Sequence, residues 1–236
     1  GPSEFGPATG KPVRAITIAD CACRENQIFE EWLVRDYAGI AQQLGMDVAD
    51  AATGFAEVDV RDGTDILASH RANMARLRAG AIGSDLTGAS TADHEALVRR
   101  WLKALWHGGD LEALKQVYDF RVGARYPGAR DLYGPDQVLP VVQRLTDTLS
   151  DIQTQIDHLC AVPYLGEGLD VAVRWSLVGT HAHDGAYGAP LNRDLYVLGI
   201  SHLRIIRGRI REEVTIWDDL ALRRMIEGAR IRGAST

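Results

Sequence analysis

Cysteine is scarce in this sequence. Its 236 residues include only Cys21, Cys23 and Cys160. Three cysteines cannot form a disulfide framework, and no second cysteine pair or close histidine pair completes a zinc-binding set. We therefore expect a protein without a metal site, located in the reducing cytoplasm.

Long apolar runs and positive charge are scarce as well. No run of 18 apolar residues occurs, which argues against a transmembrane helix, and no secretory signal is recognised. The net charge is −6 and the sequence pI is about 5.6, which argues against nucleic-acid binding because such surfaces are basic. Glycine-rich phosphate loops and nucleophile elbows are missing. We expect no cofactor, no nucleic-acid partner and no membrane partner.

The remaining composition is typical of a globular protein with a sizeable core. Apolar residues make up 46% of the chain and charged residues 25%. The length suits one large domain or two small ones. We interpret residues 1–5 as a cloning remnant.

Residues 6–45 have the pattern of a hairpin followed by a short helix. The segments Val13–Cys23 and Ile28–Arg35 favour strands. Asp36 then suits the start of a helix, and Gly45 suits its end. Such a unit is too small to bury a core alone. Residues 46–90 are rich in Ala, Gly, Asp and Ser, so we interpret them as a linker with one helix near 66–77.

The signals are clearer from Thr91 onwards. Three helices are expected to begin at Thr91, Asp110 and Pro135, with a turn-rich excursion over Arg125–Tyr133 before the third. Four strands and a closing helix follow, at Ile152–Ala161, Leu169–His181, Leu195–Ile206, Arg209–Trp217 and Asp218–Met225. Helices followed by an antiparallel meander indicate an α+β fold.

An ungapped internal repeat joins the two ends of the chain. Ile28-Phe29-Glu30-Glu31 and Ile210-Arg211-Glu212-Glu213 lie 182 positions apart, and the same offset pairs Ile18 with Ile200 and Asp36 with Asp218. A repeat of this length indicates duplicated domains. We therefore expect the back half of one copy at 6–45, a linker at 46–90, a complete copy at 91–227 and a tail at 228–236. The half-copy would be completed by its missing front half, by the linker helix at 66–77, or by another chain, for example in a homodimer.

A family resemblance rests on several short segments. They are Trp106-His107-Gly108-Gly109-Asp110-Leu111, Leu132-Tyr133-Gly134-Pro135, Val171-Ala172-Val173-Arg174-Trp175 and the stretch from Gly199 to Leu222. With these segments the chain resembles the SnoaL-like polyketide cyclases of the nuclear-transport-factor-2-like superfamily. The resemblance implies a cone, in which a curved antiparallel sheet wraps around helices and leaves an apolar pocket. A partial second copy stands at the N-terminus.

The resemblance also implies a function. Such proteins bind a small hydrophobic molecule, here polyketide- or terpenoid-like, and catalyse cofactor-free cyclisation, isomerisation or hydrolysis by general acid-base chemistry. The family's catalytic Asp and His fall on Thr215 and Ser201, and its Asn and Tyr fall near Val141 and Trp106. None of these four positions matches, so a non-catalytic binding or assembly module of the same fold is the alternative.

Strand alternation identifies Glu213 as the best catalytic candidate. Residues two apart share a face of a strand, so Glu213 shares the pocket face with Thr215 and Trp217, and Ser201 and Leu203 join them from the neighbouring strand. A carboxylate on an apolar wall has its pKa raised by burial, which suits acid or base catalysis. The alternative is an ion pair with an arginine, for which Arg174, Arg204, Arg209 and Arg211 are available.

Other side chains are assigned to the pocket. His181 is the second catalytic candidate, at the pocket rim, and a metal site with His183 and Asp184 is the alternative that we consider weaker. Trp106, Tyr126, Val141 and Trp175 complete the expected lining. Cys21 and Cys23 align with Leu203 and Ile205, which predicts that both cysteines are buried.

Overall fold

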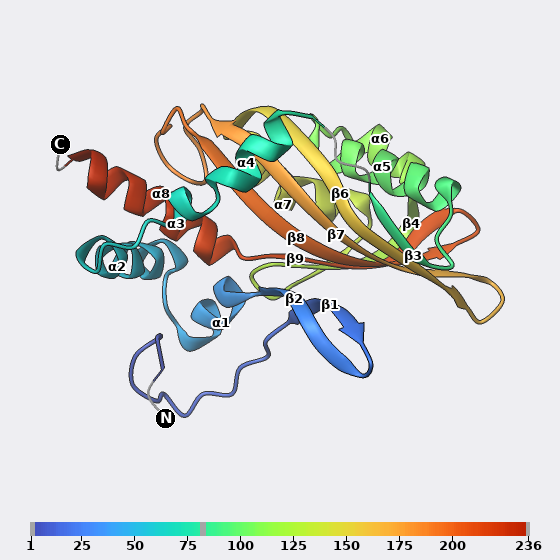
Figure 1. Cartoon of the computed structure of the whole chain (residues 1–236), viewed down its shortest axis with the longest axis horizontal. Helices are drawn as coiled ribbons and strands as arrows, with labels where there is room; N and C mark the ends of the chain where they lie inside the picture. Colours follow the sequence, from blue (N-terminus) through green and yellow to red (C-terminus); the bar gives the residue numbers. More distant parts are fainter. Residues whose placement is uncertain (1–2, 81–83, 235–236) are drawn as a thin grey trace.

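The computed structural model describes residues 3–80 and 84–234 (Figure 1). Its strands are β1 (Thr17–Arg24), β2 (Gln27–Arg35), β3 (Asp85–Gly88), β4 (Tyr118–Tyr126), β5 (Arg130–Tyr133), β6 (Leu149–Tyr164), β7 (Gly168–His181), β8 (Asp194–Ile206) and β9 (Arg209–Trp217). Its helices are α1 (Tyr37–Leu44), α2 (Val48–Arg61), α3 (Ile66–Ser69), α4 (Arg71–Arg78), α5 (Ala92–Trp106), α6 (Leu111–Val117), α7 (Pro135–Thr146) and α8 (Asp219–Ala234).

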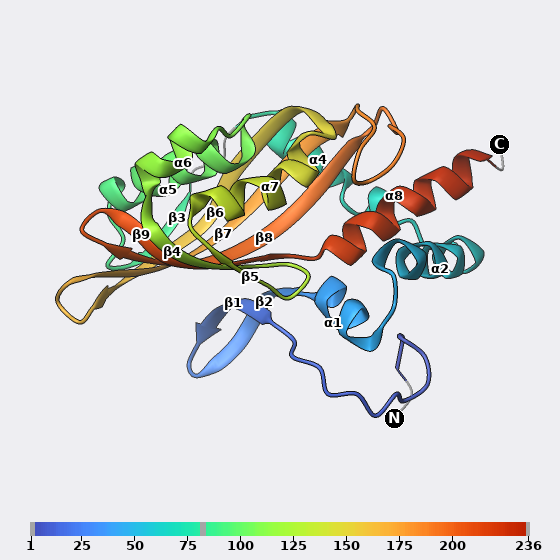
Figure 2. The same cartoon turned by 180° about the vertical axis from the view of Figure 1, so that it is seen from behind.

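Seven strands form one curved sheet in the order β3-β6-β7-β8-β9-β4-β5. The four strands β6 to β9 are the expected antiparallel meander. The sheet is extended by parallel pairing of β3 with β6 and of β4 with β9. Helices α5, α6 and α7 cover one face, which we call the inner face (Figure 2). The predicted α+β fold, a curved sheet around helices, is confirmed.

Capping side chains place two of the three helices that cover the inner face. Thr91 and His94 form a reciprocal capping box at the start of α5. Asp110 accepts a hydrogen bond of 2.7 Å from the Ala113 amide and so begins α6. Leucine, valine and tryptophan side chains on the sheet-facing sides of these helices are buried. Burial of this apolar stripe holds the helices in the curve of the sheet.

The segment 46–90 contains more structure than a linker with one helix. Helix α2 begins where Asp47 accepts hydrogen bonds from the amides of Ala49 and Asp50. The alanines that suggested a linker form a small-residue face, where Ala52 and Ala56 are fully buried. The helix expected near 66–77 is two helices, α3 and α4, which meet at His70.

Two other boundaries differ from expectation. The excursion over Arg125–Tyr133 is the antiparallel pair β4–β5. The closing helix α8 continues to Ala234, past Met225 and through the segment assigned to a tail. Phe5, in the segment interpreted as a cloning remnant, packs against the rings of Tyr37 and Phe55.

The β1–β2 hairpin forms a separate two-stranded sheet on the outer face of the main sheet, opposite α5 to α7 (Figures 1 and 2). Ile18 and Val34 form a buried cluster there with Ile200 and Ile216. Cys21 and Cys23 are exposed, so their predicted burial is wrong. The reason is that even-numbered positions of β1 face the main sheet, which leaves the odd-numbered cysteines on the far face.

Candidate functional site

Glu213 lies in β9 with its carboxylate buried under the helices, and only 1% of the residue is exposed. The turn at Gly208, where φ is +75°, fixes the register of β8 and β9. Across these strands Leu203 is paired with Glu213 and Ser201 with Thr215. These four residues therefore share the inner face, as strand alternation predicts.

Three hydroxyl groups donate hydrogen bonds to the Glu213 carboxylate. The Tyr118 hydroxyl is 2.5 Å from Oε2 and the Tyr126 hydroxyl is 2.6 Å from Oε1. The Thr215 hydroxyl also donates to Oε1. The arginine ion pair considered above is wrong, because the available arginines bond elsewhere: Arg174 to Asp20, Arg204 to Asp170 and Glu212, Arg209 to backbone carbonyls and Arg211 to Asp119.

The direction of the hydrogen bonds around Glu213 follows from its carboxylate, which in the ionised form only accepts. An indole N–H can only donate. Trp175 Nε1 donates to Ser201 Oγ at 3.0 Å, and the Ser201 and Thr215 hydroxyls are 2.8 Å apart. Thr215 has one hydroxyl proton and donates it to Glu213, so in its bond with Ser201 it accepts and Ser201 donates.

A second chain of donors reaches the carboxylate from α5. Trp101 Nε1 donates to the Tyr118 hydroxyl at 3.0 Å, and Tyr118 donates to Glu213. Every donor in both chains therefore points toward the carboxylate, an arrangement that suits its ionised form.

Burial and hydrogen bonding act on Glu213 in opposite directions. Burial raises the pKa of the Glu213 carboxyl, and the hydroxyls of Thr215, Tyr118 and Tyr126 oppose the shift. Burial and the nearby Glu213 charge raise the pKa of Tyr118 and of Tyr126 well above the usual value for a phenol. Both phenols therefore remain protonated donors, while the carboxyl has a raised affinity for a proton.

Aromatic rings occupy the interior beside this carboxylate. The Trp106 ring centroid lies 5.0 Å from that of Trp175 and 5.5 Å from that of Trp217. The Tyr126 and Trp217 centroids are 5.9 Å apart. All four residues are buried. The tryptophans thus take up space that the family resemblance assigned to an open pocket.

Two indole groups of this interior lack a partner. Among the described residues, Trp106 Nε1 and Trp217 Nε1 are buried and have no hydrogen-bond acceptor. A buried donor without an acceptor costs about 1–3 kcal/mol, so each indole calls for an acceptor, which a buried water molecule or a bound ligand would supply.

His181 is buried but stands apart from Glu213. Burial lowers the pKa of its imidazole, and Arg230 adds to the effect. Neither ring nitrogen has a hydrogen-bond partner within residues 3–80 and 84–234. Pairing across the sheet places Val171 level with Glu213, and His181 is ten residues further along β7, about 33 Å for an extended strand. The structure does not bring the two catalytic candidates together.

The other residues predicted to line a pocket belong to the buried interior. Trp106, Tyr126, Trp175, Ser201, Leu203, Thr215 and Trp217 are all buried. Val141 of α7 is partly buried against the same core. Sequence reasoning missed Tyr118, which was assigned to a helix. The alternation of Val122, Ala124 and Tyr126 is the signal for β4 that could have placed it.

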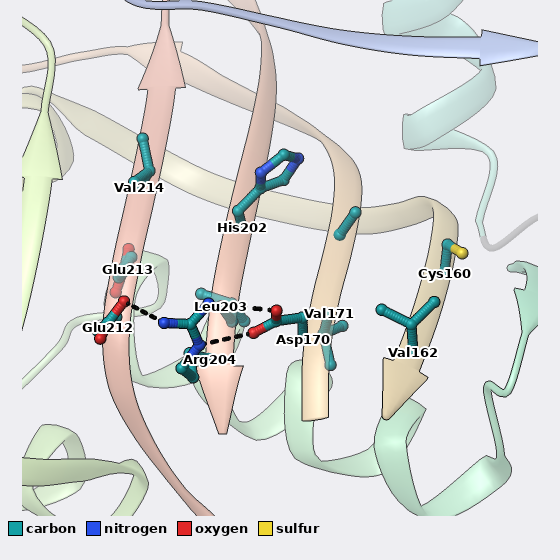
Figure 3. Close-up of a pocket in the computed structure, with 11 residues that line it drawn as sticks. Cys160, Val162, Asp170, Val171, His202, Leu203, Arg204, Glu212, Glu213 and Val214 are labelled. Carbon is teal, nitrogen blue, oxygen red and sulfur yellow. Dashed lines mark hydrogen bonds and ion pairs between the residues drawn. The ribbon is translucent and has the colours of Figure 1, made fainter. Parts of the chain in front are cut away.

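A cavity of about 390 Å³ lies on the outer face, with Cys160, Val162, Ala172, His202 and Val214 in its lining (Figure 3). Arg204 crosses it and bonds to both Asp170 and Glu212 at 2.9 Å. Figure 3 shows this ion group on strands β7, β8 and β9. The cavity is therefore distinct from the aromatic interior that holds the Glu213 carboxylate.

Two features that would indicate other functions are absent from the described part of the chain. Within residues 3–80 and 84–234, no group of three or more His, Cys, Asp and Glu side chains is placed to hold a metal ion. No helix among these residues is long and apolar enough to cross a membrane.

The family model for the SnoaL-like polyketide cyclases matches residues 96–226. The chain belongs to this family. The matched segment contains the whole Glu213 network and the three interior tryptophans. No curated protein matches the chain in sequence.

Solved structures with a similar fold share little sequence with this SnoaL-like protein. IdmH from Streptomyces antibioticus is 20% identical, with a TM-score of 0.47, and the match covers 56% of this chain and 96% of that one. TsrD from Streptomyces laurentii is 20% identical, with a TM-score of 0.45 and coverage of 59% and 98%. A ketosteroid isomerase-like protein from Catenulispora acidiphila, solved with trimethylamine, is 13% identical, with a TM-score of 0.42 and coverage of 56% and 91%.

Proposed function

We propose that this protein binds a small hydrophobic metabolite in its aromatic interior, where the packed tryptophan rings move apart to admit it, and promotes a cofactor-free proton transfer, in a cyclisation, isomerisation or hydrolysis. The observation that carries the proposal is the pair of buried, unpartnered indole groups, Trp106 Nε1 and Trp217 Nε1, in the same interior as the Glu213 carboxylate, to which Trp217 is linked through Tyr126. Indole donors require an acceptor, and a carbonyl oxygen of a polyketide- or terpenoid-like molecule would supply one. The free cysteines support the cytoplasm as its location.

The proposed chemistry uses Tyr126 as the link between ligand and carboxylate. Its hydroxyl donates to Glu213 and its ring contacts Trp217. As a proton leaves the ligand for Tyr126 Oη, the phenol's own proton passes to Glu213 Oε1. The ligand oxygen then carries the negative charge, and the indole N–H groups stabilise it. The raised pKa of the Glu213 carboxyl suits a base that must hold a proton near neutral pH.

Binding without catalysis is the second candidate. Both Glu213 oxygens already accept hydrogen bonds, and Ser201 and Thr215 occupy the positions at which the family resemblance places His and Asp. An assembly or storage module would need only the apolar interior.

The test is turnover of a panel of polycyclic and aromatic β-ketoesters, followed by mass spectrometry, with binding measured by quenching of tryptophan fluorescence. Glu213→Gln should abolish turnover while ligand still binds. Glu212→Gln, on the exposed face of the same strand, is the matched control. Binding without turnover by the wild-type chain would favour the second candidate, and full activity of Glu213→Gln would exclude Glu213 as the base.

A further inference from the structure

The strands of the β1–β2 hairpin lie at the same positions of the repeat as the strands of the β8–β9 hairpin. Adding the repeat offset of 182 to β2 (Gln27–Arg35) gives the bounds of β9 (Arg209–Trp217), and adding it to the start of α1 gives the start of α8. β1 corresponds in the same way to the last eight residues of β8. The two segments therefore fold alike although few of their residues are identical.

These two hairpins face each other through equivalent residues. The cluster between them consists of Ile18 and Val34 from one hairpin and Ile200 and Ile216 from the other, which are the residues that the offset pairs. β1 contacts β8, and β2 contacts β9. Contact of a surface with its own equivalent is the mark of a two-fold interface between identical subunits. Here the interface lies within one chain.

We propose that the outer face of β8–β9 is a surface for two-fold association with a second copy, and that this chain covers it with its own β1–β2 hairpin. The hairpin takes the place that a second copy would otherwise occupy, so the chain is monomeric through this face. This proposal is independent of the proposed function, because the interface is on the face opposite Glu213.

Two departures from the repeat explain why the hairpin is preferred to a second copy. Asp20 stands at the position equivalent to His202, and its carboxylate bonds to Arg174 Nε at 2.7 Å and to His158 Nδ1 at 2.9 Å. A second copy would bring His202 to this place, where it meets an arginine and another histidine and offers no carboxylate. The charge at this one position therefore favours the hairpin.

The second departure is Trp32, which stands at the position equivalent to Val214. The Arg174 guanidinium lies 3.7 Å from the centroid of the Trp32 ring. An arginine over an indole face gains a cation–π attraction that valine does not offer. Asp20 thus binds the edge of the Arg174 guanidinium, and Trp32 contacts its face. A second copy would bring His202 and Val214 to these positions and could make neither contact.

The contact at the end of the hairpin unit does not favour the hairpin over a second copy. The Asp36 carboxylate, only 2% exposed, accepts hydrogen bonds from the amides of Gly39, Gly128 and Ala129. It thereby joins the start of α1 to the β4–β5 turn. Its equivalent is Asp218, the same residue type, so a second copy would present the same group. Discrimination therefore rests on Asp20 and Trp32.

The experiment replaces residues on the interface side of the β1–β2 hairpin with their equivalents from β8–β9. Asp20→His/Trp32→Val gives β1–β2 the residues of β8–β9 at the two discriminating positions. We expect light scattering after size exclusion to show 25.8 kDa for the wild-type chain and twice that mass for the variant at high concentration. Hydrogen exchange of the β1 and β2 amides should increase at the same time, because a released hairpin is unprotected.

A matched control makes the same kind of change on the far face. Cys21→Leu/Cys23→Ile also restores residues of β8–β9, but at exposed positions on the far face of the hairpin, and it should remain monomeric. Adding Ile200→Asp to the dimeric variant should return it to a monomer, since the charge lies in the apolar cluster.

Two outcomes would overturn the proposal. One is a wild-type chain that is already a dimer through β8–β9. Conversion of that dimer to a monomer by Ile200→Asp would identify the interface. The other is a variant whose hairpin amides exchange freely while its mass stays at that of the monomer. Circular dichroism verifies that each variant is folded. If Asp20→His/Trp32→Val does not fold, Trp32→Val alone is compared with Cys21→Leu by hydrogen exchange, and equal protection of β1 in both would also overturn the proposal.

Discussion

Tyr118 and Glu213, which are 95 residues apart in the chain, are joined by a hydrogen bond of 2.5 Å between the phenol hydroxyl and the carboxylate. The same hydroxyl accepts a hydrogen bond from Trp101. One phenol therefore connects helix α5 to strand β9 through the core, and two buried polar groups depend on it.

Replacing this phenol tests its role in the core. Tyr118→Phe leaves Trp101 Nε1 without an acceptor and removes one donor from Glu213, so we expect the free energy of unfolding to fall by about 2–4 kcal/mol. Denaturant titration measures the change. Tyr133→Phe, at a residue that is 69% exposed, is the control and should change stability by less than about 0.5 kcal/mol. Equal stability of the two variants would contradict the network.

Glu213→Gln should also cost stability. The amide keeps the shape of the carboxylate, but its NH₂ group faces a hydroxyl that donates, so at least one hydrogen bond is lost. We expect a loss of roughly 1–3 kcal/mol, because the hydroxyls of Tyr118, Tyr126 and Thr215 all donate to the carboxylate in the wild-type chain. Calorimetry of this variant and of Glu212→Gln, whose side chain is 60% exposed, gives the comparison. An unchanged melting temperature for Glu213→Gln would show that the hydroxyls reorient freely.

The stability of the protein should depend on pH through Asp218. Burial is the main reason that the pKa of the Asp218 carboxyl is raised to about 7, whereas the group titrates near 3.9 in an unfolded chain. Between these values the folded state holds a proton that the unfolded state releases. The contribution of Asp218 to stability is therefore fully present below about pH 4 and is lost as the pH rises to about 7.

Asp218→Asn isolates that contribution. Asparagine still caps α8 and does not titrate, so the variant should gain stability over the wild-type chain by on the order of a few kcal/mol as the pH rises from about 4 to 8. Denaturant midpoints of both chains across this range provide the measurement. A constant difference between them would refute the assignment.

Gly199 provides a test of the aromatic interior. A Cβ atom at this position would lie 2.1 Å from Trp175 Cζ2, so Gly199→Ala requires the indole to move. We expect a loss of about 1–3 kcal/mol from overpacking and a change in tryptophan fluorescence. Gly123→Ala, where a Cβ atom meets nothing within 4 Å, is the control. If both variants were equally stable, the Trp175 ring would not lie against β8.

Local sequence signals predicted much of the candidate site. The Gly208 turn and strand alternation were sufficient to place Glu213, Thr215 and Ser201 on one face, because both depend only on neighbouring residues. The capping side chains Thr91 and Asp110 predicted the starts of α5 and α6 for the same reason. Helix α2 was missed, since alanines that pack in the small-residue face of a helix have the same composition as a linker.

The partners of these residues were decided by tertiary structure alone. Strand alternation does not specify which face of an isolated hairpin is covered, so Cys21 and Cys23 were assigned to the wrong environment. It also does not bring Tyr118, at the start of β4, to Glu213 in β9, because that contact depends on parallel pairing between distant strands. The sequence by itself determined the elements and the faces of the strands. Long-range packing decided what each face meets, since burial and hydrogen bonding of a side chain depend on residues far away in the chain.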